Sequence, residues 1–166
     1  MYGIIEKKSI SIVFPGRFPY LFTMTNVAVG IIIQTNTSAL DSNRVLMCQR
    51  KPTAAYPLKW EFPGGKVENA ETIKDCLRRE LLEELGIHAD IGELFHRQQY
   101  VYPDSGTFDI FYHVVQSHSG TISNRAFSAI QWVPMNQLPQ LDILEGNRDV
   151  VQKLLHMNGH AGSITG

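Results

Sequence analysis

Residues 65–87 read GKVENAETIKDCLRRELLEELGI, and this stretch decides the fold. Within it Ile73, Leu77, Leu81 and Leu85 recur every four residues, a spacing that predicts a helix with one apolar face. Such a face has to be buried against other elements, because leaving it in water costs free energy. The stretch therefore predicts a helix that packs on the core.

Both ends of this helix carry recognisable signals. Thr72 followed three residues later by Asp75 resembles a capping box, with Asp in place of the usual Glu or Gln. Gly86 follows the last apolar residue and is suited to end the helix, since glycine adopts the left-handed conformation found there. We therefore predict a helix that begins near Thr72 and ends at Gly86.

The same helix carries three glutamates, Glu80, Glu83 and Glu84, at the spacing of one turn. Side chains three and four residues apart are surface neighbours, so these like charges repel each other, and a bound divalent cation would reverse the effect. A helical projection places Glu80 and Glu84 inside the apolar arc, where an unpaired charge is costly and Arg79 alone cannot neutralise all three. Carboxylate oxygens favour Mg²⁺ or Mn²⁺, so the pattern indicates a metal site.

A solvated acidic surface is the alternative interpretation of a helix rich in glutamate. It fits poorly here, because the arc that would face solvent is already taken by other residues. These are Lys74, Asp75, Arg78 and Leu82.

The composition predicts one globular domain. A chain of 166 residues can bury a genuine core, and its net charge of −1 provides no field toward nucleic acid or anionic membranes, so we expect neither as a partner. No segment has the length of a membrane span, and the N-terminus lacks the pattern of a signal peptide. Cys48 and Cys76 lie far apart and suit two buried thiols in a reducing compartment. We expect a cytoplasmic protein.

Outside the glutamate helix the pattern predicts strands at 27–33, 44–50, 87–102, 107–116 and 130–133, a turn at 134–138 and a helix at 147–157. The first two strands would form a hairpin, and residues 51–66, rich in Pro and Gly, would hold no regular element. Strands around one strong helix, followed by a terminal helix, indicate a mixed α/β layer architecture in a single domain.

The domain is expected to span residues 23–157, followed by a flexible tail at 158–166. Residues 1–22 form an N-terminal extension that includes a strand-like stretch at 9–14. Two roles for it stay open, a hairpin that covers a sheet edge and a contact with a second subunit in a homodimer.

The arrangement of fixed residues in the decisive stretch is similar to the Nudix box. Gly65 is followed after five residues by Glu71, and after seven more by RELLEELGI at residues 79–87, which matches every defined position of that motif. So many fixed positions within 23 residues rarely coincide by chance. The resemblance implies a Nudix-type α/β/α sandwich around a mixed β-sheet.

A looser similarity to MutT-type nucleoside triphosphate pyrophosphohydrolases extends from about residue 27 to residue 155. It is supported by WEFPGGKVE at residues 60–68 and by YPD at residues 102–104. This resemblance implies divalent-metal-dependent hydrolysis of a pyrophosphate bond in a nucleoside diphosphate linked to another group. The favoured substrate is a nucleoside triphosphate, including oxidised or non-standard forms, cleaved to the monophosphate and pyrophosphate.

Carried over position by position, the resemblance implies a metal site on this helix. Glu83 and Glu84 would be metal ligands together with the carbonyl oxygen of Gly64. Glu80 would be a further ligand, directly or through water, or would orient or deprotonate the attacking water, and Arg79 would hold it in place. The metal would be Mg²⁺ or Mn²⁺. Three further positions would be structural: Gly65, Glu71 and Gly86.

One departure from the family pattern concerns the general base. Related enzymes often supply a further glutamate from the loop before the strand that holds Trp132, but residues 123–129 contain no carboxylate here. Glu80 becomes the leading candidate for the base, with Asp104 and Asp109 as weaker alternatives.

Five residues are candidates for binding the substrate. Arg50 and Lys66 could meet the phosphates, although Arg50 could equally be a surface residue. Phe62 could flank the base or belong to the core, and Tyr102 could stack on the base or serve packing alone. Asn147 falls where an asparagine reads the purine edge in the MutT-like alignment, and it could also cap the last helix.

Two rival functions stay open. Tyr102 and Pro103 lie close to positions used in other Nudix groups to suggest dinucleoside polyphosphates or ADP-ribose as substrates. A non-catalytic nucleotide-sensing module is the rival of another class. Such modules commonly carry an eroded box or an attached DNA-binding domain, and this chain shows neither.

Overall fold

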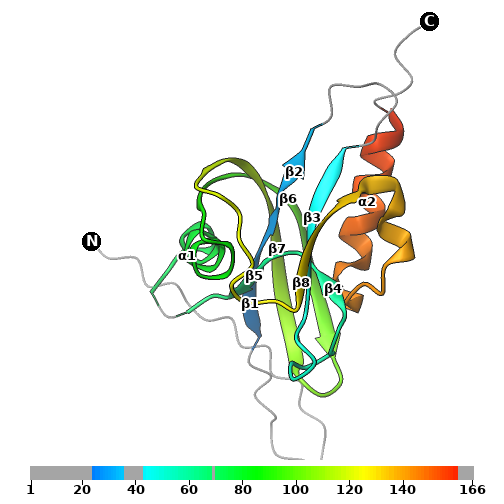
Figure 1. Cartoon of the computed structure of the whole chain (residues 1–166). Coiled ribbons are helices and arrows are strands. Elements are labelled where there is room, and N and C mark those ends of the chain that lie inside the picture. Colours follow the sequence, from blue (N-terminus) through cyan, green and yellow to red (C-terminus); the bar gives the residue numbers. More distant parts are fainter. Residues whose placement is uncertain (1–23, 36–42, 69, 161–166) are drawn as a thin grey trace, which may run out of the picture.

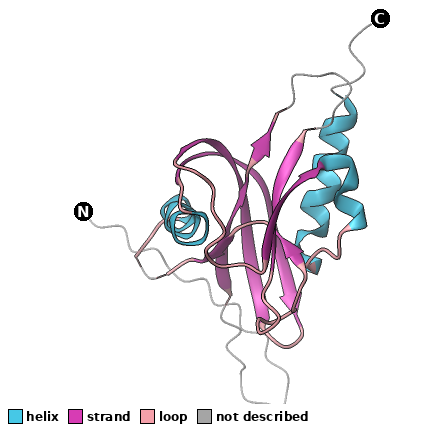
Figure 2. Cartoon of the chain, viewed as in Figure 1, coloured by secondary structure: helices cyan, strands magenta, loops and turns pink. Residues whose placement is uncertain are grey.

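The strands lie between two helices, α1 (Ile73–Leu85) on one side and α2 (Arg148–His160) on the other (Figures 1 and 2). A computed structural model describes residues 24–35, 43–68 and 70–160, with side chains up to residue 157. The expectations for residues 1–22 and 161–166 lie outside this part. The three layers confirm the predicted α/β/α sandwich. Within the described ranges, no helix has the length and apolar composition needed to cross a membrane.

The larger sheet has the strand order β5-β1-β7-β6. Its strands are β1 (Thr25–Ile31), β5 (Gly64–Lys66), β6 (His88–Tyr102) and β7 (Gly106–Ser119). β1 runs parallel to β7, whereas the β1–β5 and β6–β7 pairs are antiparallel. The predicted mixed sheet is therefore present. The strands predicted at 87–102 and 107–116 are β6 and β7, and β6 lies at one edge of this sheet.

A smaller sheet is built around β3, which pairs with β2, β4 and β8 in antiparallel fashion. Its strands are β2 (Ile33–Gln34), β3 (Arg44–Gln49), β4 (Trp60–Glu61) and β8 (Ala129–Pro134). Two 3₁₀ helices follow β8, namely η1 (Met135–Gln140) and η2 (Glu145–Asn147). η2 leads directly into α2.

The predicted single strand at 27–33 is wrong, because the chain is interrupted at Ile32 and contributes to both sheets. β1 lies in the larger sheet and β2 in the smaller one. At the interruption the carbonyl oxygen of Ile32 still accepts a hydrogen bond of 3.0 Å from the backbone N–H of Leu46. The expected hairpin with β3 is thus formed by the two residues of β2 alone.

Three further boundaries differ from the sequence-based expectation. Segment 51–66 contains two short strands, β4 and β5, because β3 and β1 supply hydrogen-bonding partners that its Pro and Gly content does not reveal. The predicted turn at 134–138 is the 3₁₀ helix η1. α2 begins at Arg148 and reaches His160, so the first three residues of the predicted tail are helical.

Helix α1 begins and ends as predicted. The side-chain oxygen of Thr72 accepts a hydrogen bond of 3.1 Å from the backbone N–H of Asp75. Gly86 adopts a φ of 73°, and its N–H donates to the carbonyl oxygen of Leu82 at 3.1 Å. A left-handed residue at this position satisfies carbonyl groups that the helix would otherwise leave free.

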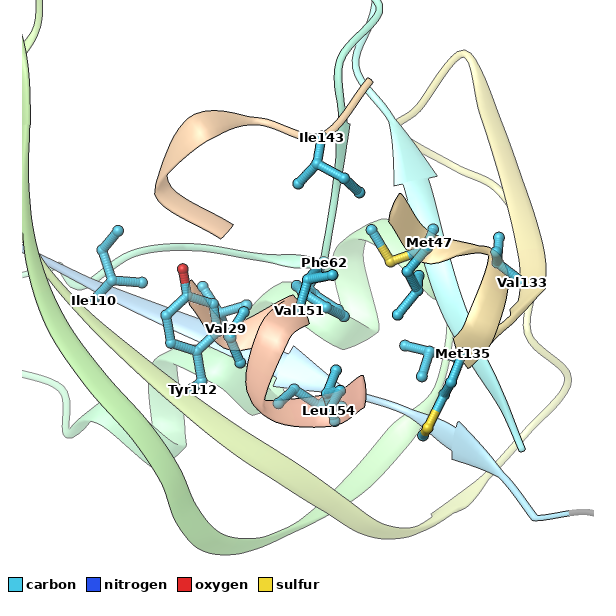
Figure 3. Packing of buried hydrophobic residues seen from close by; sticks show 14 residues of the cluster. Val29, Met47, Phe62, Ile110, Tyr112, Val133, Met135, Ile143, Val151 and Leu154 are labelled. Carbon is cyan, nitrogen blue, oxygen red and sulfur yellow. The ribbon is translucent and has the colours of Figure 1, made fainter. Parts of the chain in front are cut away.

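Two apolar clusters fill the space on either side of the strands. Successive residues of β1 belong to different clusters: Ala28 packs on the α1 side and Val29 on the α2 side, as the alternation of a strand requires. Figure 3 shows the α2-side cluster, in which Tyr112 and Leu154 are also buried. Cys48 and Cys76 are free thiols in the α1-side cluster, as expected from the sequence.

A matched pair of leucines on α1 tests this packing. Leu81 is fully buried and Leu82 is 37% exposed. We predict that Leu81→Ala lowers the free energy of unfolding by about 2–5 kcal/mol, because it leaves a cavity, whereas Leu82→Ala changes it by about 0.5 kcal/mol. Urea denaturation of both variants measures the difference, and equal losses would contradict the assigned orientation of α1.

Candidate active site

A cavity of about 330 Å³ opens on the α2-side face of the larger sheet. Its walls combine Val27 and Val29 of β1, Phe108 and Ile110 of β7, and Glu84 of α1. All five predicted substrate-binding residues also line it: Arg50, Phe62, Lys66, Tyr102 and Asn147. The fold thus brings together residues that are up to 97 positions apart in the sequence, from Arg50 to Asn147.

Two glycines of β5, Gly64 and Gly65, leave room for the elements that pack against them. The N–H of Gly64 donates to Oε2 of Glu84 at 3.0 Å. Gly64 has a φ of 144°, and a Cβ there would lie 2.1 Å from the carbonyl oxygen of Ala28. A Cβ on Gly65 would lie 2.1 Å from Oε1 of Glu80. Gly64 thus lets β5 lie close to β1, and the carboxyl group of Glu80 occupies the space that a side chain at Gly65 would fill.

Arg79 organises the acidic side chains around α1. Its guanidinium donates to Glu80 at 2.9 Å, to Glu83 at 3.4 Å and to Glu71 at 2.9 Å. Glu71 also accepts a hydrogen bond from the backbone N–H of Glu68 at 2.7 Å. The hydrogen bonds from Arg79, and to a smaller extent the one from Glu68, lower the pKa of Glu71 to about 2. Glu71 thus ties the loop before α1 to the helix.

The three glutamates differ in their surroundings. Burial raises the pKa of Glu84 to about 8. The hydrogen bond from Gly64 acts to lower this pKa, whereas repulsion from Glu80 raises it further. Burial also raises the pKa of Glu80, although Arg79 acts in the opposite direction. The Glu83 side chain is 58% exposed. As the helical projection predicted, Glu80 and Glu84 are the sheltered pair.

The donor groups fit a hard divalent cation. Among the described residues, no group of three or more His, Cys, Asp or Glu side chains lies close enough to form a complete metal site. Mg²⁺ commonly uses only one or two carboxylates and takes its other ligands from water and substrate phosphates. A sheltered Glu84 with a raised pKa, next to the glycine backbone, is the kind of carboxylate that a cation would stabilise in its charged form.

Glu61 is a cavity residue to which the sequence analysis assigned no role. Nη1 of Arg50 lies 2.8 Å and 2.7 Å from the two carboxylate oxygens of Glu61, and Nε donates to the carbonyl oxygen of Ala55 at 2.7 Å. Burial raises the pKa of Glu61 even with Arg50 beside it. The pair forms because β4 lies next to the end of β3, with Glu61 opposite Cys48, and only the sheet register reveals this.

Asn147 is 5% exposed and lies at the end of η2, directly before α2. Its Oδ1 accepts from the hydroxyl of Tyr112 at 2.9 Å, so this oxygen is turned toward the sheet. The preceding residue, Gly146, donates its N–H to the hydroxyl of Tyr102 at 3.0 Å. Burial raises the pKa of Tyr102 to about 12. Tyr102 therefore lines the cavity and also holds the η2 turn.

Phe62 and Lys66 each have a second contact within the protein. Phe62 is 3% exposed and belongs to the α2-side cluster while also lining the cavity, so the two predicted roles coexist. Nζ of Lys66 lies 5.7 Å from the ring centroid of Phe108, another cavity residue. Its charge is therefore placed at the cavity wall.

The two weaker candidates for the general base lie in different places. Asp109 is 1% exposed and accepts from Arg97 at 3.0 Å and 2.6 Å. It sits between Phe108 and Ile110, which line the cavity, so it points to the opposite face of β7 and is not part of the site. Asp104, in the β6–β7 turn, accepts from the hydroxyl of Tyr56.

Glu84 makes the stability of the metal-free protein depend on pH. Its pKa is about 8 in the folded chain against 4.5 as the reference value, so the folded state binds this proton more tightly. Stability from this group is complete below pH 4.5 and is lost as the pH rises through 8. We predict that in EDTA the melting temperature falls less between pH 5 and pH 8 for Glu84→Gln than for the wild type. Glu83→Gln, at an exposed position, should largely keep the wild-type fall, and identical falls for all three proteins would contradict the burial of Glu84.

Comparison with known proteins places the chain in a family. The NUDIX domain model matches residues 24–154. An 8-oxo-dGTP diphosphatase of Escherichia coli K12 is 31% identical over 128 residues, covering 77% of this chain and 94% of that protein. The CTP pyrophosphohydrolase of the same strain is 36% identical over 89 residues, covering 54% and 65%. The solution structure of the E. coli ORF135 protein has a TM-score of 0.70 at 25% identity, covering 84% and 94%. The chain therefore belongs to the Nudix family of hydrolases.

Proposed function

We propose that this protein is a divalent-metal-dependent hydrolase of nucleoside triphosphates, which it cleaves to the nucleoside monophosphate and pyrophosphate. The observation that carries the proposal is the composition of one cavity. Glu84, which is bonded to Gly64 of β5, lines the same 330 Å³ space as the cations of Arg50 and Lys66 and the amide of Asn147. A cavity that combines a carboxylate, two cations and an amide able to hydrogen-bond to a nucleobase suits a nucleotide. Its volume lies at the small end of the range for ligand sites.

The metal-binding role is assigned to the glutamates of α1. Glu83, Glu84 and the carbonyl oxygen of Gly64 would hold Mg²⁺ or Mn²⁺, with Glu80 as a further ligand or a partner of the attacking water. When bound, the metal would neutralise negative charge on the phosphoryl group and lower the pKa of its bound water. Support comes from the packing of Glu80 and Glu84 against the two glycines.

Glu80 is the proposed base, with Arg79 as its positioning residue. Arg79 holds Oε1 of Glu80 at 2.9 Å, which leaves Oε2 to accept a proton from water. Burial raises the pKa of Glu80, and a base with a pKa closer to neutrality transfers protons more effectively at physiological pH. Glu71 acts through Arg79, which it anchors at 2.9 Å.

The phosphates and the base are assigned to opposite parts of the cavity. Arg50 and Lys66 would bind the phosphates, and the pairing of Arg50 with Glu61 would hold its guanidinium in place. Tyr102 and Phe62 would contact the base, and Asn147 would read its edge by hydrogen bonding.

Oxidised guanine nucleotides are the first substrate candidates, because relatives of this chain are named 8-oxo-dGTP diphosphatases. CTP is the second, since another relative is named a CTP pyrophosphohydrolase. We propose that the protein acts in the cytoplasm, where the buried free thiols of Cys48 and Cys76 would stay reduced.

A panel of nucleotides separates this proposal from its rivals. The purified protein with Mg²⁺ should release pyrophosphate from 8-oxo-dGTP, dGTP or CTP faster than it cleaves ADP-ribose or a dinucleoside polyphosphate. Faster cleavage of ADP-ribose or of a dinucleoside polyphosphate would support that compound as the substrate instead. Tight nucleotide binding without turnover in Mg²⁺ or Mn²⁺ would support a sensing module.

The metal assignment predicts a loss of turnover without a loss of fold. Glu83→Gln and Glu84→Gln should each lower kcat by at least about a hundredfold, because metal ligands contribute several kcal/mol to the barrier. Glu93→Gln, at an exposed position on β6, should keep the wild-type rate. Steady-state kinetics with Mg²⁺ and circular dichroism measure the two properties, and near-normal rates in either variant would show the metal assignment to be wrong.

The base-reading role predicts a different effect at Asn147. Asn147→Ala should change the ratio of kcat/KM between guanine nucleotides and other nucleotides by about tenfold. The kcat for the nucleotide that the variant cleaves best should stay similar to that of the wild type. Measurement of kcat and KM on the same panel tests this. An unchanged ratio would leave Asn147 with a structural role at the start of α2.

A further inference from the structure

The loop that joins β7 to β8, residues 120–128, lies against the C-terminal end of α1 (Figure 1). The backbone N–H of Ser123 donates to the carbonyl oxygen of Leu85 at 2.9 Å, and that of Arg125 donates to Glu84 at 3.0 Å. The hydroxyl of Ser123 also donates to Leu85, at 3.3 Å. The loop therefore satisfies carbonyl groups that the end of a helix otherwise leaves without a partner.

The side chain of Arg125 covers the same helix end. Its Nη1 donates to the carbonyl oxygen of Leu82 at 3.3 Å. A Cβ on Gly86 would lie 2.4 Å from Nη2 of Arg125, so the guanidinium lies directly against the left-handed residue that ends α1. The glycine thus both ends the helix and leaves space for this cation.

The helix end under Arg125 has an unfavourable distribution of charge. A helix carries partial negative charge at its C-terminus, so a basic residue stabilises the last turn and an acidic residue destabilises it. The last turn of α1, residues 82–85, holds Glu83 and Glu84 and no basic residue. Arg79 lies one turn earlier and is shared among three carboxylates. Arg125 therefore supplies, from a distant loop, the cation that this turn lacks.

A compact turn fixes the remainder of the loop. The side chain of Asn124 accepts a hydrogen bond from the N–H of Phe127 and donates one to its carbonyl oxygen, both at 2.9 Å. The ring of Phe127 packs against the α1-side cluster. The N–H of Ser128 donates to the carbonyl oxygen of Gln49 at 2.8 Å. The loop is thus held at both ends, on α1 and on the end of β3.

We propose that Arg125 is a positioning residue for the metal site, which caps the last turn of α1 and so keeps Glu83 and Glu84 in the helical conformation that lets them bind one cation. Fraying of this turn would release both carboxylates. The apparent metal affinity would then fall with the fraction of molecules whose helix end is intact. This inference rests on the proposed function, since it takes Glu83 and Glu84 as metal ligands.

The charge of Arg125, considered without its capping role, predicts the opposite effect. A guanidinium near the two carboxylates repels a divalent cation, so its removal would tighten metal binding if the helix end stayed in place. The sign of the change in metal affinity therefore distinguishes the positioning role from a purely electrostatic one.

Binding of Mn²⁺ to the metal-free protein tests the proposal without turnover. Electron paramagnetic resonance measures free Mn²⁺ and gives the Kd. Arg125→Ala should raise this Kd about two- to fivefold, the size of a charge interaction at a helix end. Arg78→Ala is the matched control, because it removes one positive charge from an exposed position of the same helix, where Arg78 pairs with Asp75. It should keep the wild-type Kd.

The conservative variant and hydrogen exchange test the capping itself. Arg125→Lys should give a Kd closer to that of the wild type than Arg125→Ala does, because a lysine near a helix end can still donate to its carbonyl oxygens. In the absence of metal, the amides of residues 82–87 should exchange about two- to fivefold faster in Arg125→Ala than in the wild type. The amides of residues 76–79, in the middle of α1, should exchange at the wild-type rate, which shows that the fold is kept.

The outcomes separate this inference from the proposed function. An unchanged or lower Kd for Mn²⁺ in Arg125→Ala, an equal rise in Arg78→Ala, or unchanged exchange at residues 82–87 would overturn the positioning role, even with pyrophosphate release intact. A wild-type protein that binds no Mn²⁺, or a wild-type Kd in both Glu83→Gln and Glu84→Gln, would instead overturn the metal assignment of the proposed function.

Discussion

The close contact between α1 and the two glycines of β5 is the constraint on which the rest of the site depends. The N–H of Gly64 bonds to Glu84, and Gly65 leaves room for the carboxyl group of Glu80. A side chain at Gly64 would clash with the backbone of β1, and one at Gly65 would displace the carboxyl group of Glu80. The apolar stripe of α1 supplies the burial that keeps this contact closed, so the same packing both stabilises the domain and brings two carboxylates to its interior edge.

Holding carboxylates in this position costs free energy in the absence of a cation. Burial raises the pKa of Glu84 to about 8, and Arg79 is shared among Glu71, Glu80 and Glu83 rather than reaching Glu84. One guanidinium therefore compensates part of the acidic charge, and the remainder favours a bound divalent ion. In the proposed function, a bound metal and the cations at the cavity wall would complete the charge balance of the site.

Local signals in the sequence were sufficient for α1 and for the two long strands β6 and β7. The caps at Thr72 and Gly86 and the four-residue apolar repeat act within a few residues, so they can be recognised without knowledge of the fold. The same signals were misleading at 27–33 and at 51–66. There, membership of a sheet depends on partners far along the chain, which neither β-branched residues nor proline and glycine content specify.

By itself, the sequence determined the family, the glutamate helix and the identity of its sheltered carboxylates, because these follow from spacing along one helix. Only the tertiary structure decided which distant residues share the cavity. It paired Arg50 with Glu61, turned Asp109 to the opposite face of β7, and placed the hydroxyl of Tyr112 against Asn147. The physical reason is that sheet register and strand faces are set by long-range hydrogen bonding and burial, which no local segment encodes.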